Sequence, residues 1–247
     1  MPCTLDRSAN IATITFGSAA HNALSSELLV QIRHQLIALD EDQSIKIIVL
    51  KSEGDRTFCA GADLNELLSI ENVEMGIAFF LHFAELIIAI RKSPHIVLCR
   101  VQGKAIGGAV GIVAASDYVI ATAQAQIRLS ELINGIGPFV VGPAIERKMG
   151  LSAFSYMTLT PADWHSAAYA LHHGLYNEVT NDISSLNLSV DRKLKEWSGY
   201  STKALKEIKH MFWSTTPLWD ELLKERSAIS GKLIMSDESK AALKKLK

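Results

Sequence analysis

The sequence predicts an α/β fold with a helical C-terminal region, and three observations lead to this prediction. Short runs rich in β-branched residues alternate with helical patterns over roughly the first 130 residues. Such alternation favours a sheet whose strands are largely parallel. After about residue 140 the strand patterns mostly disappear and helical patterns follow. Finally, 48% hydrophobic and 21% charged residues in a chain of 247 supply enough material for a packed core.

Five strands and four helices are predicted along the first part of the chain. The β-branched run IATITF (11–16) predicts a strand, and leucine and isoleucine at helical spacing predict a helix over 22–40, with Ser25 or Ser26 as its N-cap. The apolar run IKIIVLK (45–51) is typical of a strand buried on both faces. The other predicted strands are at 96–101, 117–122 and 126–130. The other predicted helices are one that begins at DLNELL (63–68) and two that cover 75–92 and 107–116. Residues 55–62 and GKAIGG (103–108) are expected to be glycine-containing loops.

The last part of the chain is expected to be helical. The predicted helical segments are 141–158, 161–173, 183–213 and 217–246. Gly150, Gly174 and Pro217 are expected to interrupt or separate them. We therefore divide the chain into an α/β core at 1–195 and a helical region at 196–247. The lysine-rich tail, including Lys240, Lys244, Lys245 and Lys247, is interpreted as the solvated face of an amphipathic helix.

Composition and charge limit which classes of partner and which cell compartment the sequence supports. With 25 Lys+Arg and 26 Asp+Glu, the net charge of -1 gives no support for a nucleic-acid or anionic-membrane partner. Charged residues interrupt the apolar stretches well short of 18 residues, so no membrane span is predicted, and the N-terminus MPCTLDRSAN has no apolar signal region. Three scattered cysteines and eight histidines without ligand spacing predict neither a disulfide framework nor a metal site. We expect a cytoplasmic protein.

Two short segments have a chemical interpretation. In FCAGADL (58–64) and in QGKAIGGA (102–109), a loop of small residues turns into a helix. The first N–H groups of a helix lack intrahelical acceptors and carry partial positive charge, so each segment suits an oxygen with negative charge. Two such N–H groups at one point would form an oxyanion hole. Neither segment has the glycine spacing of a phosphate-binding loop.

The two segments, about 45 residues apart in this order, resemble the enoyl-CoA hydratase/isomerase family (the crotonase superfamily). The resemblance covers roughly residues 10–180 in register. Its segments are HNAL (21–24), FCAGADL (58–64), VQGKAIGG (101–108), ASDYVIA (115–121), LSELINGIGP (129–138), RKMGLS (147–152) and HHGLYNEV (172–179). The resemblance implies a crotonase-like ββα spiral core.

The resemblance also implies a site. The backbone N–H groups of Ala62 and Gly108 would hold the thioester oxygen of an acyl-CoA and stabilise its enolate. The residues expected to lie against the substrate are Ala60, Gly61, Asp63, Leu64, Gly107, Gly111 and Pro138. For Asp63 we prefer a helix-capping role, and Asp117 is likewise expected to be structural. Cys59, with no histidine near it in the sequence, is interpreted as a packing residue rather than a nucleophile.

The acid–base residues decide the reaction. Family hydratases use two glutamates, of which this chain keeps Glu131 and has Gly111 at the other position. A single carboxylate suits a different reaction, in which one base removes a proton from the α-carbon and returns it to the γ-carbon. Family isomerases resemble this arrangement. We therefore favour enoyl-CoA double-bond isomerisation, with apolar neighbours raising the pKa of Glu131.

Two alternatives stay open. A hydratase could take its second acid from the 75–92 helix, where His82 and Glu85 are three residues apart. A protein that lacks the second acid could also bind an acyl-CoA without turning it over.

The resemblance implies no separate cofactor, because CoA is part of the substrate. Lys104 and the tail lysines are candidate contacts for the CoA phosphates. Phe79, Phe80 and Phe83 are candidates for an apolar acyl pocket, although they also suit a core. The family commonly forms trimers or paired trimers, so we expect a homotrimer or homohexamer, with the 196–247 region in its contacts.

Overall fold

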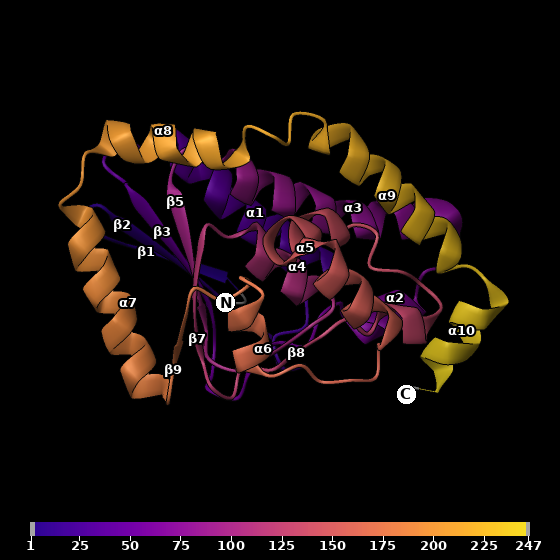
Figure 1. Ribbon diagram of the computed structural model, residues 1–247. Coiled ribbons are helices and arrows are strands. Elements are labelled where there is room, and N and C mark those ends of the chain that lie inside the picture. The colour runs from indigo at the N-terminus through magenta and orange to yellow at the C-terminus, as the bar shows by residue number, and fades with distance from the viewer. Residues whose placement is uncertain (1–2, 246–247) are drawn as a thin grey trace.

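The computed structural model describes residues 3–245, and its large sheet confirms the predicted α/β class (Figure 1). The strands of this sheet, in spatial order, are β1 (Cys3–Ser8), β2 (Ile11–Phe16), β3 (Ile47–Ser52), β5 (Ile96–Val101), β7 (Tyr118–Thr122) and β9 (Glu178–Thr180). Only β1 pairs antiparallel, in a hairpin with β2. The sequence did not predict β1 and β9, because β1 is a largely polar edge strand and β9 has only three residues.

A second, smaller sheet consists of β4 (Thr57–Cys59), β6 (Lys104–Ile106) and β8 (Ile127–Arg128), all parallel. Each of three successive strands of the large sheet leads into one strand of the small sheet and then into a helix. This repetition is the expected ββα spiral. The prediction of loops at 55–62 and 103–108 was wrong at β4 and β6, because strands of three residues are too short to show an alternating pattern.

The helices of the core largely follow the prediction. They are α1 (Ser26–Asp40), α2 (Leu64–Leu68), α3 (Val73–Lys92), α4 (Gly108–Ala115), the 3₁₀ helix η1 (Glu131–Asn134), α5 (Gly142–Leu159) and α6 (Ala167–His172). Ser25 is the N-cap of α1, since its side chain accepts from the N–H of Leu28. Gly150, with a φ of 80°, interrupts α5 at the position where a helix break was predicted. The helix predicted over 161–173 is reduced to α6, whose N-cap is Ser166.

Four helices form the C-terminal part: α7 (Ile183–Ser198), α8 (Thr202–Trp213), α9 (Trp219–Leu233) and α10 (Asp237–Lys244). Two predicted helices are thus each divided in two, and serine N-caps at Ser201 and Ser236 start the second halves. The predicted end of the last helix at residue 246, and Lys247 of the tail, lie outside the described residues. The predicted core boundary at residue 195 falls within α7.

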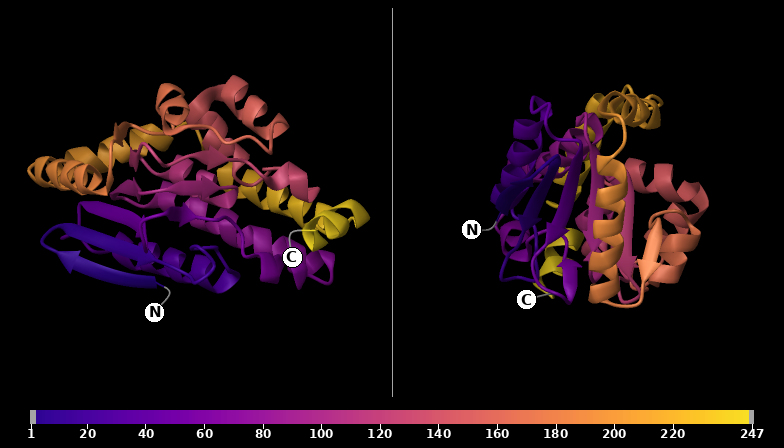
Figure 2. Two further views of the ribbon diagram at one scale, coloured as in Figure 1. Left: turned by 90° about the horizontal axis from the view of Figure 1, so that it is seen from below. Right: turned by 90° about the vertical axis from the view of Figure 1, so that its left-hand side faces the viewer.

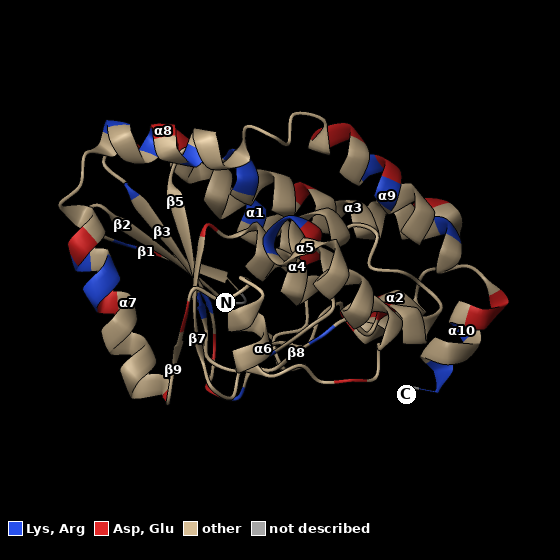
Figure 3. Cartoon of the chain, viewed as in Figure 1, with Lys and Arg blue, Asp and Glu red and all other residues tan. Residues whose placement is uncertain are grey.

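The C-terminal helices surround the core. Leu186 and Val190 of α7 pack on one face of the large sheet, against Val49, Leu98 and Ile120. Figure 1 shows α8 and α9 running along the outside, and α10 lies beside α2 of the N-terminal half (Figure 2). In Figure 3, basic and acidic residues are interspersed along α7, α8 and α9, as expected for solvated helix faces.

Helix α3 is the one helix among residues 3–245 that is long and apolar enough to cross a membrane by length and composition. The sequence prediction judged only uncharged runs and so overlooked it. Its buried residues, which include Phe79, Phe83 and Ile87, belong to the main hydrophobic core, and the helix contacts α1, α4 and α9. These contacts are those of a core helix.

Helices α3 and α9 touch backbone to backbone through two glycines. A Cβ atom on Gly76 would lie 2.7 Å from the carbonyl oxygen of Gly231. A Cβ atom on Gly231 would lie 2.4 Å from the backbone nitrogen of Ile77. Because any side chain would force the helices apart, this contact fixes α9 against the core.

A buried ion pair joins α8 to the core. The Nζ atom of Lys209, whose residue is 2% exposed, lies 2.6 Å from Asp117 Oδ2. The Asp117 carboxylate also accepts from Trp213 Nε1 at 2.9 Å and from the backbone N–H of Val97 at 2.8 Å. The contacts of Asp117 are those of the structural residue that the sequence predicted.

Replacing Lys209 by Met should lower the free energy of unfolding by about 3 kcal/mol or more, because Asp117 would keep a buried charge without its cation. Urea denaturation followed by circular dichroism measures the change. The matched control is Lys203→Met, at an exposed position of the same helix, with an expected change within about 0.5 kcal/mol. The double variant Asp117→Asn/Lys209→Met should recover part of the loss. Equal stability of the two lysine variants would contradict a structural role for the pair.

Candidate functional site

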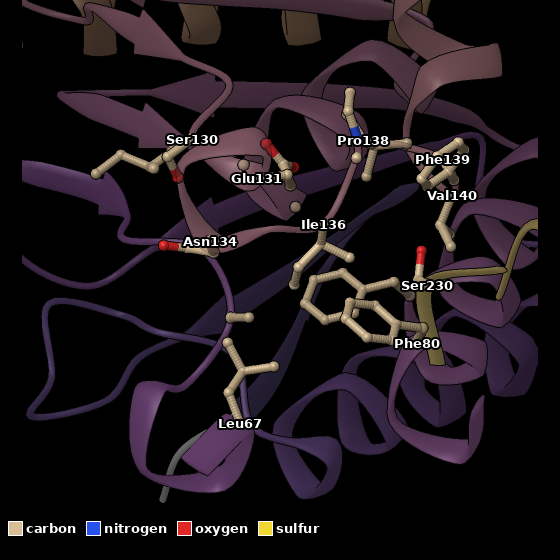
Figure 4. Close-up of a pocket in the computed structure, with 18 of the residues that line it drawn as sticks. Leu67, Phe80, Ser130, Glu131, Asn134, Ile136, Pro138, Phe139, Val140 and Ser230 are labelled. Carbon is tan, nitrogen blue, oxygen red and sulfur yellow. The ribbon is translucent and has the colours of Figure 1, made fainter. Parts of the chain in front are cut away.

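A cavity of about 350 Å³ lies between the two glycine loops, η1 and helices α2, α3 and α9 (Figure 4). Parallel pairing of β4 with β6 brings the loops together, since both begin where these strands end. The lining residues are Ala60, Gly61, Ala62, Leu64, Leu67, Phe80, Phe83, Ile106, Gly107, Gly108, Arg128, Ser130, Glu131, Ile133, Asn134, Ile136, Gly137, Pro138, Phe139, Val140, Val141 and Ser230.

Two backbone N–H groups at this cavity are free of internal partners. Leu24 forms a parallel bridge with Ala62, in which Leu24 donates to Gly61 and accepts from Asp63. Such a bridge leaves the N–H of Ala62 itself directed away from Leu24. Gly108 is the first residue of α4, so its N–H has no intrahelical acceptor. Within residues 3–245 neither N–H donates to another backbone or side-chain group.

The turns before these N–H groups require glycine. Gly61 has a φ of 91°, and a Cβ atom there would lie 2.9 Å from the carbonyl oxygen of Ile106. Gly107 has a φ of 54°, and a Cβ atom there would lie 3.2 Å from Glu131 Oε1. The loops can therefore approach each other, and Glu131 can approach Gly107, only in the absence of side chains.

Two buried amide side chains hold the first loop in place. Asn22 Nδ2 donates to the carbonyl oxygens of Glu53 and Thr57, at 2.8 and 3.0 Å. Gln102 Nε2 donates to Ser52 Oγ at 2.8 Å and to the Thr57 carbonyl at 3.2 Å. These bonds connect β4 to the ends of β3 and β5, so the position of the loop is set by the large sheet.

Glu131 begins η1 and directs its carboxylate into the cavity. Its Oε2 atom is fully buried and has no hydrogen-bond partner in the described part of the chain. Burial raises the pKa of Glu131 to about 7, an effect that a bond to its own backbone N–H offsets only in part. The site thus combines two free N–H donors with a carboxyl group that titrates near neutral pH.

Eight of the predicted site residues meet at the cavity: Ala60, Gly61, Ala62, Leu64, Gly107, Gly108, Glu131 and Pro138. Asp63 does not line it. The Asp63 side chain caps α2, accepting from the N–H of Glu66 at 3.0 Å, as we preferred from the sequence. Cys59 is fully buried, and burial raises the pKa of its thiol to about 12, which fits packing and not nucleophilic chemistry.

Gly111, which we expected to lie against the substrate, does not line the cavity. Gly111 is buried behind Val141, and a Cβ atom on Gly111 would lie 2.4 Å from Val141 Cγ1. Val141 itself lines the cavity. The space that a side chain at position 111 would need is therefore filled with hydrocarbon.

His82 also lies outside the cavity lining, contrary to the prediction. Its Nδ1 atom lies 3.5 Å from Glu85 Oε2, and Glu85 forms an ion pair with Arg33 of α1. Burial and the Arg33 charge lower the pKa of His82 below its ordinary value. Glu85 is thus engaged in an ion pair between α1 and α3, whereas the Nδ1 atom of His82 is buried without a hydrogen-bond partner in the described part of the chain.

Lys104 is exposed and does not line the cavity either, but it belongs to a cationic cluster beside it. The Nζ atom of Lys104 lies 4.5 Å from the ring centre of Trp164. The guanidinium of Arg128, which does line the cavity, lies 4.6 Å from the same ring. Within residues 3–245 neither cation forms an ion pair. No local pattern in the sequence marks Arg128 or Trp164, which meet only in the fold.

The rest of the lining is mostly apolar. Phe80 and Phe83, two of the three predicted candidates, face the cavity, while Phe79 is buried and packs edge-on against both. Phe139, Val140 and Ser230 were not predicted, since no local pattern marks them as neighbours of the glycine loops. The cavity therefore has a polar part around the loops and Glu131 and an aromatic part between α3 and α9.

Residues 6–245 match the family model described as Enoyl-CoA hydratase/isomerase. (E)-benzylidenesuccinyl-CoA hydratase of Thauera aromatica is 26% identical over 211 residues, covering 84% of this chain and 81% of that protein. Bacillaene synthase dehydratase PksH of Bacillus subtilis is 28% identical over 152 residues, covering 61% of this chain and 58% of that protein. Enoyl-CoA hydratase domain-containing protein 2 of Mus musculus is 28% identical over 71% of this chain, which matches 59% of that protein.

Solved structures show the same fold. The enoyl-CoA hydratase from Bacillus halodurans superposes with a TM-score of 0.90 at 22% identity, covering 99% of this chain and 100% of that chain. DspI of Pseudomonas aeruginosa superposes with a TM-score of 0.81 at 25% identity, covering 87% of this chain and 81% of that chain. The first likeness, at its low identity, shows the fold alone and confirms the expected crotonase-like core.

Glu131 should make the stability of the protein depend on pH. Because its pKa is raised on folding, its favourable contribution is complete below the unfolded pKa of about 4.3 and is lost as the pH rises to about 7. Glu131→Gln removes this loss. We compare the free energy of unfolding of the variant with that of the wild type at each pH. The difference, variant minus wild type, should be more positive at about pH 8 than at about pH 4, by up to roughly 3 kcal/mol.

Urea denaturation at both pH values measures this difference, with Glu146→Gln, at an exposed position of α5, as the control. A difference between Glu131→Gln and wild type that is the same at both pH values would show that the carboxyl titrates as in the unfolded chain.

Proposed function

Since this chain belongs to the enoyl-CoA hydratase/isomerase family, we propose that it isomerises an enoyl-CoA, moving the double bond from the 3,4- to the 2,3-position. One observation carries the proposal. Glu131 is the one carboxylate among the described lining residues, and Val141 fills the space in front of Gly111. One carboxylate is sufficient for a proton shift between two carbons, whereas water addition needs a second acid or base.

The two free N–H groups supply the electrostatic part of the reaction. The thioester oxygen would accept hydrogen bonds from the N–H groups of Ala62 and Gly108. These bonds strengthen as negative charge develops on the oxygen in the enolate. Loss of one such donor costs about 3–4 kcal/mol of transition-state stabilisation in enzymes of known mechanism. No separate cofactor is required for this step.

Glu131 would move the proton. Its carboxylate takes the proton from the α-carbon, and the electrons of that C–H bond form the enolate. The double bond then re-forms between the α- and β-carbons, while the electrons of the former β,γ-bond take the proton back from Glu131 at the γ-carbon. A pKa near 7 suits both halves of this cycle, because the group accepts and returns a proton with similar ease.

The cationic cluster beside the cavity suits the anionic end of CoA. Lys104 and Arg128 lie on the Trp164 ring and carry charges that no acidic residue among 3–245 neutralises by an ion pair. Phosphate groups would meet these cations while the acyl part enters the cavity. The homotrimer or homohexamer expected from the sequence stays a prediction, as does the role of the C-terminal helices in it.

Hydration of a 2-enoyl-CoA is the second candidate, and the names of the relatives favour it. Two of the relatives above are described as enoyl-CoA hydratase domain-containing protein 2 and as (E)-benzylidenesuccinyl-CoA hydratase. Against it stand the positions of His82 and Glu85, which the sequence offered as substitute acids and which lie outside the lining. A hydratase would therefore need an acid from elsewhere.

Glu131→Gln should lower the isomerisation rate of a 3-enoyl-CoA about 10³-fold, because the amide cannot take up the α-proton. In the wild type, kcat/KM should rise with pH up to about 7 and then level off, since the base must be ionised. Absorbance of the conjugated thioester product measures both. Glu85→Gln is the control and should keep the wild-type profile.

Two results would contradict the proposal. One is full isomerase turnover by Glu131→Gln. The other is hydration of crotonyl-CoA that exceeds isomerisation and that His82→Ala abolishes, which would establish the hydratase.

A further inference from the structure

A serine hydroxyl lies in the aromatic part of the cavity. Ser230 of α9 is 1% exposed, and it lines the cavity together with Phe80, Phe139 and Val140. Figure 4 shows its oxygen beside Val140 and Phe80, on the opposite side of Glu131 from Ser130 and Asn134. An acyl chain that starts at the glycine loops and passes Glu131 would bring its distal carbons to this hydroxyl.

The Ser230 hydroxyl has no protein partner within residues 3–245. Ser227, one turn earlier in α9, shows the usual alternative, since its hydroxyl donates to the carbonyl oxygen of Leu223 at 2.8 Å. Ser230 forms no such bond, and its oxygen faces the cavity instead. A ligand oxygen that bonds to this hydroxyl forms a hydrogen bond that the protein itself does not supply there, so it gains binding energy over a plain hydrocarbon chain.

The position of Ser230 is set in advance. Its neighbour Gly231 touches the backbone of α3 at Gly76 and Ile77, and these contacts leave no space for a shift of the helix toward the core. The backbone that carries the hydroxyl is therefore held in place, so a ligand meets the hydroxyl at a defined part of the cavity wall, which favours recognition of a particular polar group.

The surrounding charges define that group. The charged residues of the described lining are Arg128 and Glu131, and Ser230 lies among Phe80, Phe139 and Val140. A carboxylate on the distal chain would be buried without a cation, which is costly. A neutral hydroxyl or keto oxygen has no such penalty, and a serine hydroxyl can both donate to it and accept from it.

We propose that Ser230 makes the site selective for acyl-CoAs that carry a hydroxyl or keto oxygen on the distal part of the acyl chain. This inference rests on the proposed acyl-CoA function and identifies the substrate class within it. It concerns binding of the acyl chain and is independent of whether the reaction is isomerisation or hydration.

Unreactive ligand pairs test the proposal without any turnover. Isothermal titration calorimetry gives the Kd of hexanoyl-CoA and of 6-hydroxyhexanoyl-CoA, and likewise of the octanoyl and 8-hydroxyoctanoyl pair, for the wild type. For at least one chain length the wild type should bind the hydroxylated ligand more tightly. Ser230→Ala should reduce that preference about tenfold and leave the Kd of the plain acyl-CoA unchanged or lower. Ser227→Ala, the matched control, should keep the wild-type preference.

The outcomes separate the two proposals. A wild type that binds both members of every pair equally, or a preference that survives in Ser230→Ala, would overturn the role of Ser230 while leaving the isomerase intact. A preference that is lost in Ser230→Ala, in a protein that fails to convert 3-enoyl-CoAs, would support the role of Ser230 and count against the isomerase. Failure of the wild type to bind any of these acyl-CoAs would overturn both.

Discussion

The parallel pairing of β4 with β6 is the contact on which the site depends. These strands have only three residues each, yet their pairing brings Gly61 against Ile106. The pairing of β6 with β8 in turn brings Gly107 against Glu131. The free N–H groups of Ala62 and Gly108 follow directly after these glycines. Because backbone atoms fix both donors, the polarity of the site is built into the fold and needs no charged side chain to create it.

Burial of Glu131 is the second constraint, and it acts on both chemistry and stability. The hydrocarbon around its carboxyl raises the pKa of Glu131 to about 7, which makes the group a competent base near neutral pH and also costs folding free energy when it ionises. Val141 lines the same cavity and occupies the space in front of Gly111. One apolar residue thus excludes a side chain at the second position.

The sequence was sufficient for those parts of the site that depend on local structure. The glycine turns follow from neighbouring residues, whereas Ala62, Gly108 and Glu131 were expected from the family resemblance of their short segments, and the structure brings them to one cavity. His82 was offered as a substitute acid from helical spacing alone, which gives no information on which face of α3 meets the cavity, and the structure leaves it outside the lining. Ser230 and Arg128 could not be predicted, since they reach the cavity through the glycine contact of α9 with α3 and through the meeting of β8 with Trp164. Long-range packing leaves no local pattern.

The proposed mechanism requires that two backbone N–H groups and one carboxylate form an enolate in this cavity. Exchange of the α-protons of bound hexanoyl-CoA with deuterium from D₂O, followed by mass spectrometry, tests this step alone, because exchange requires only the enolate and no later step. We predict exchange with the wild type and loss of exchange with Glu131→Gln, although both proteins bind the ligand. Absence of exchange in a wild type that binds hexanoyl-CoA would contradict the proposed mechanism and identify a protein that binds acyl-CoA without acting on it.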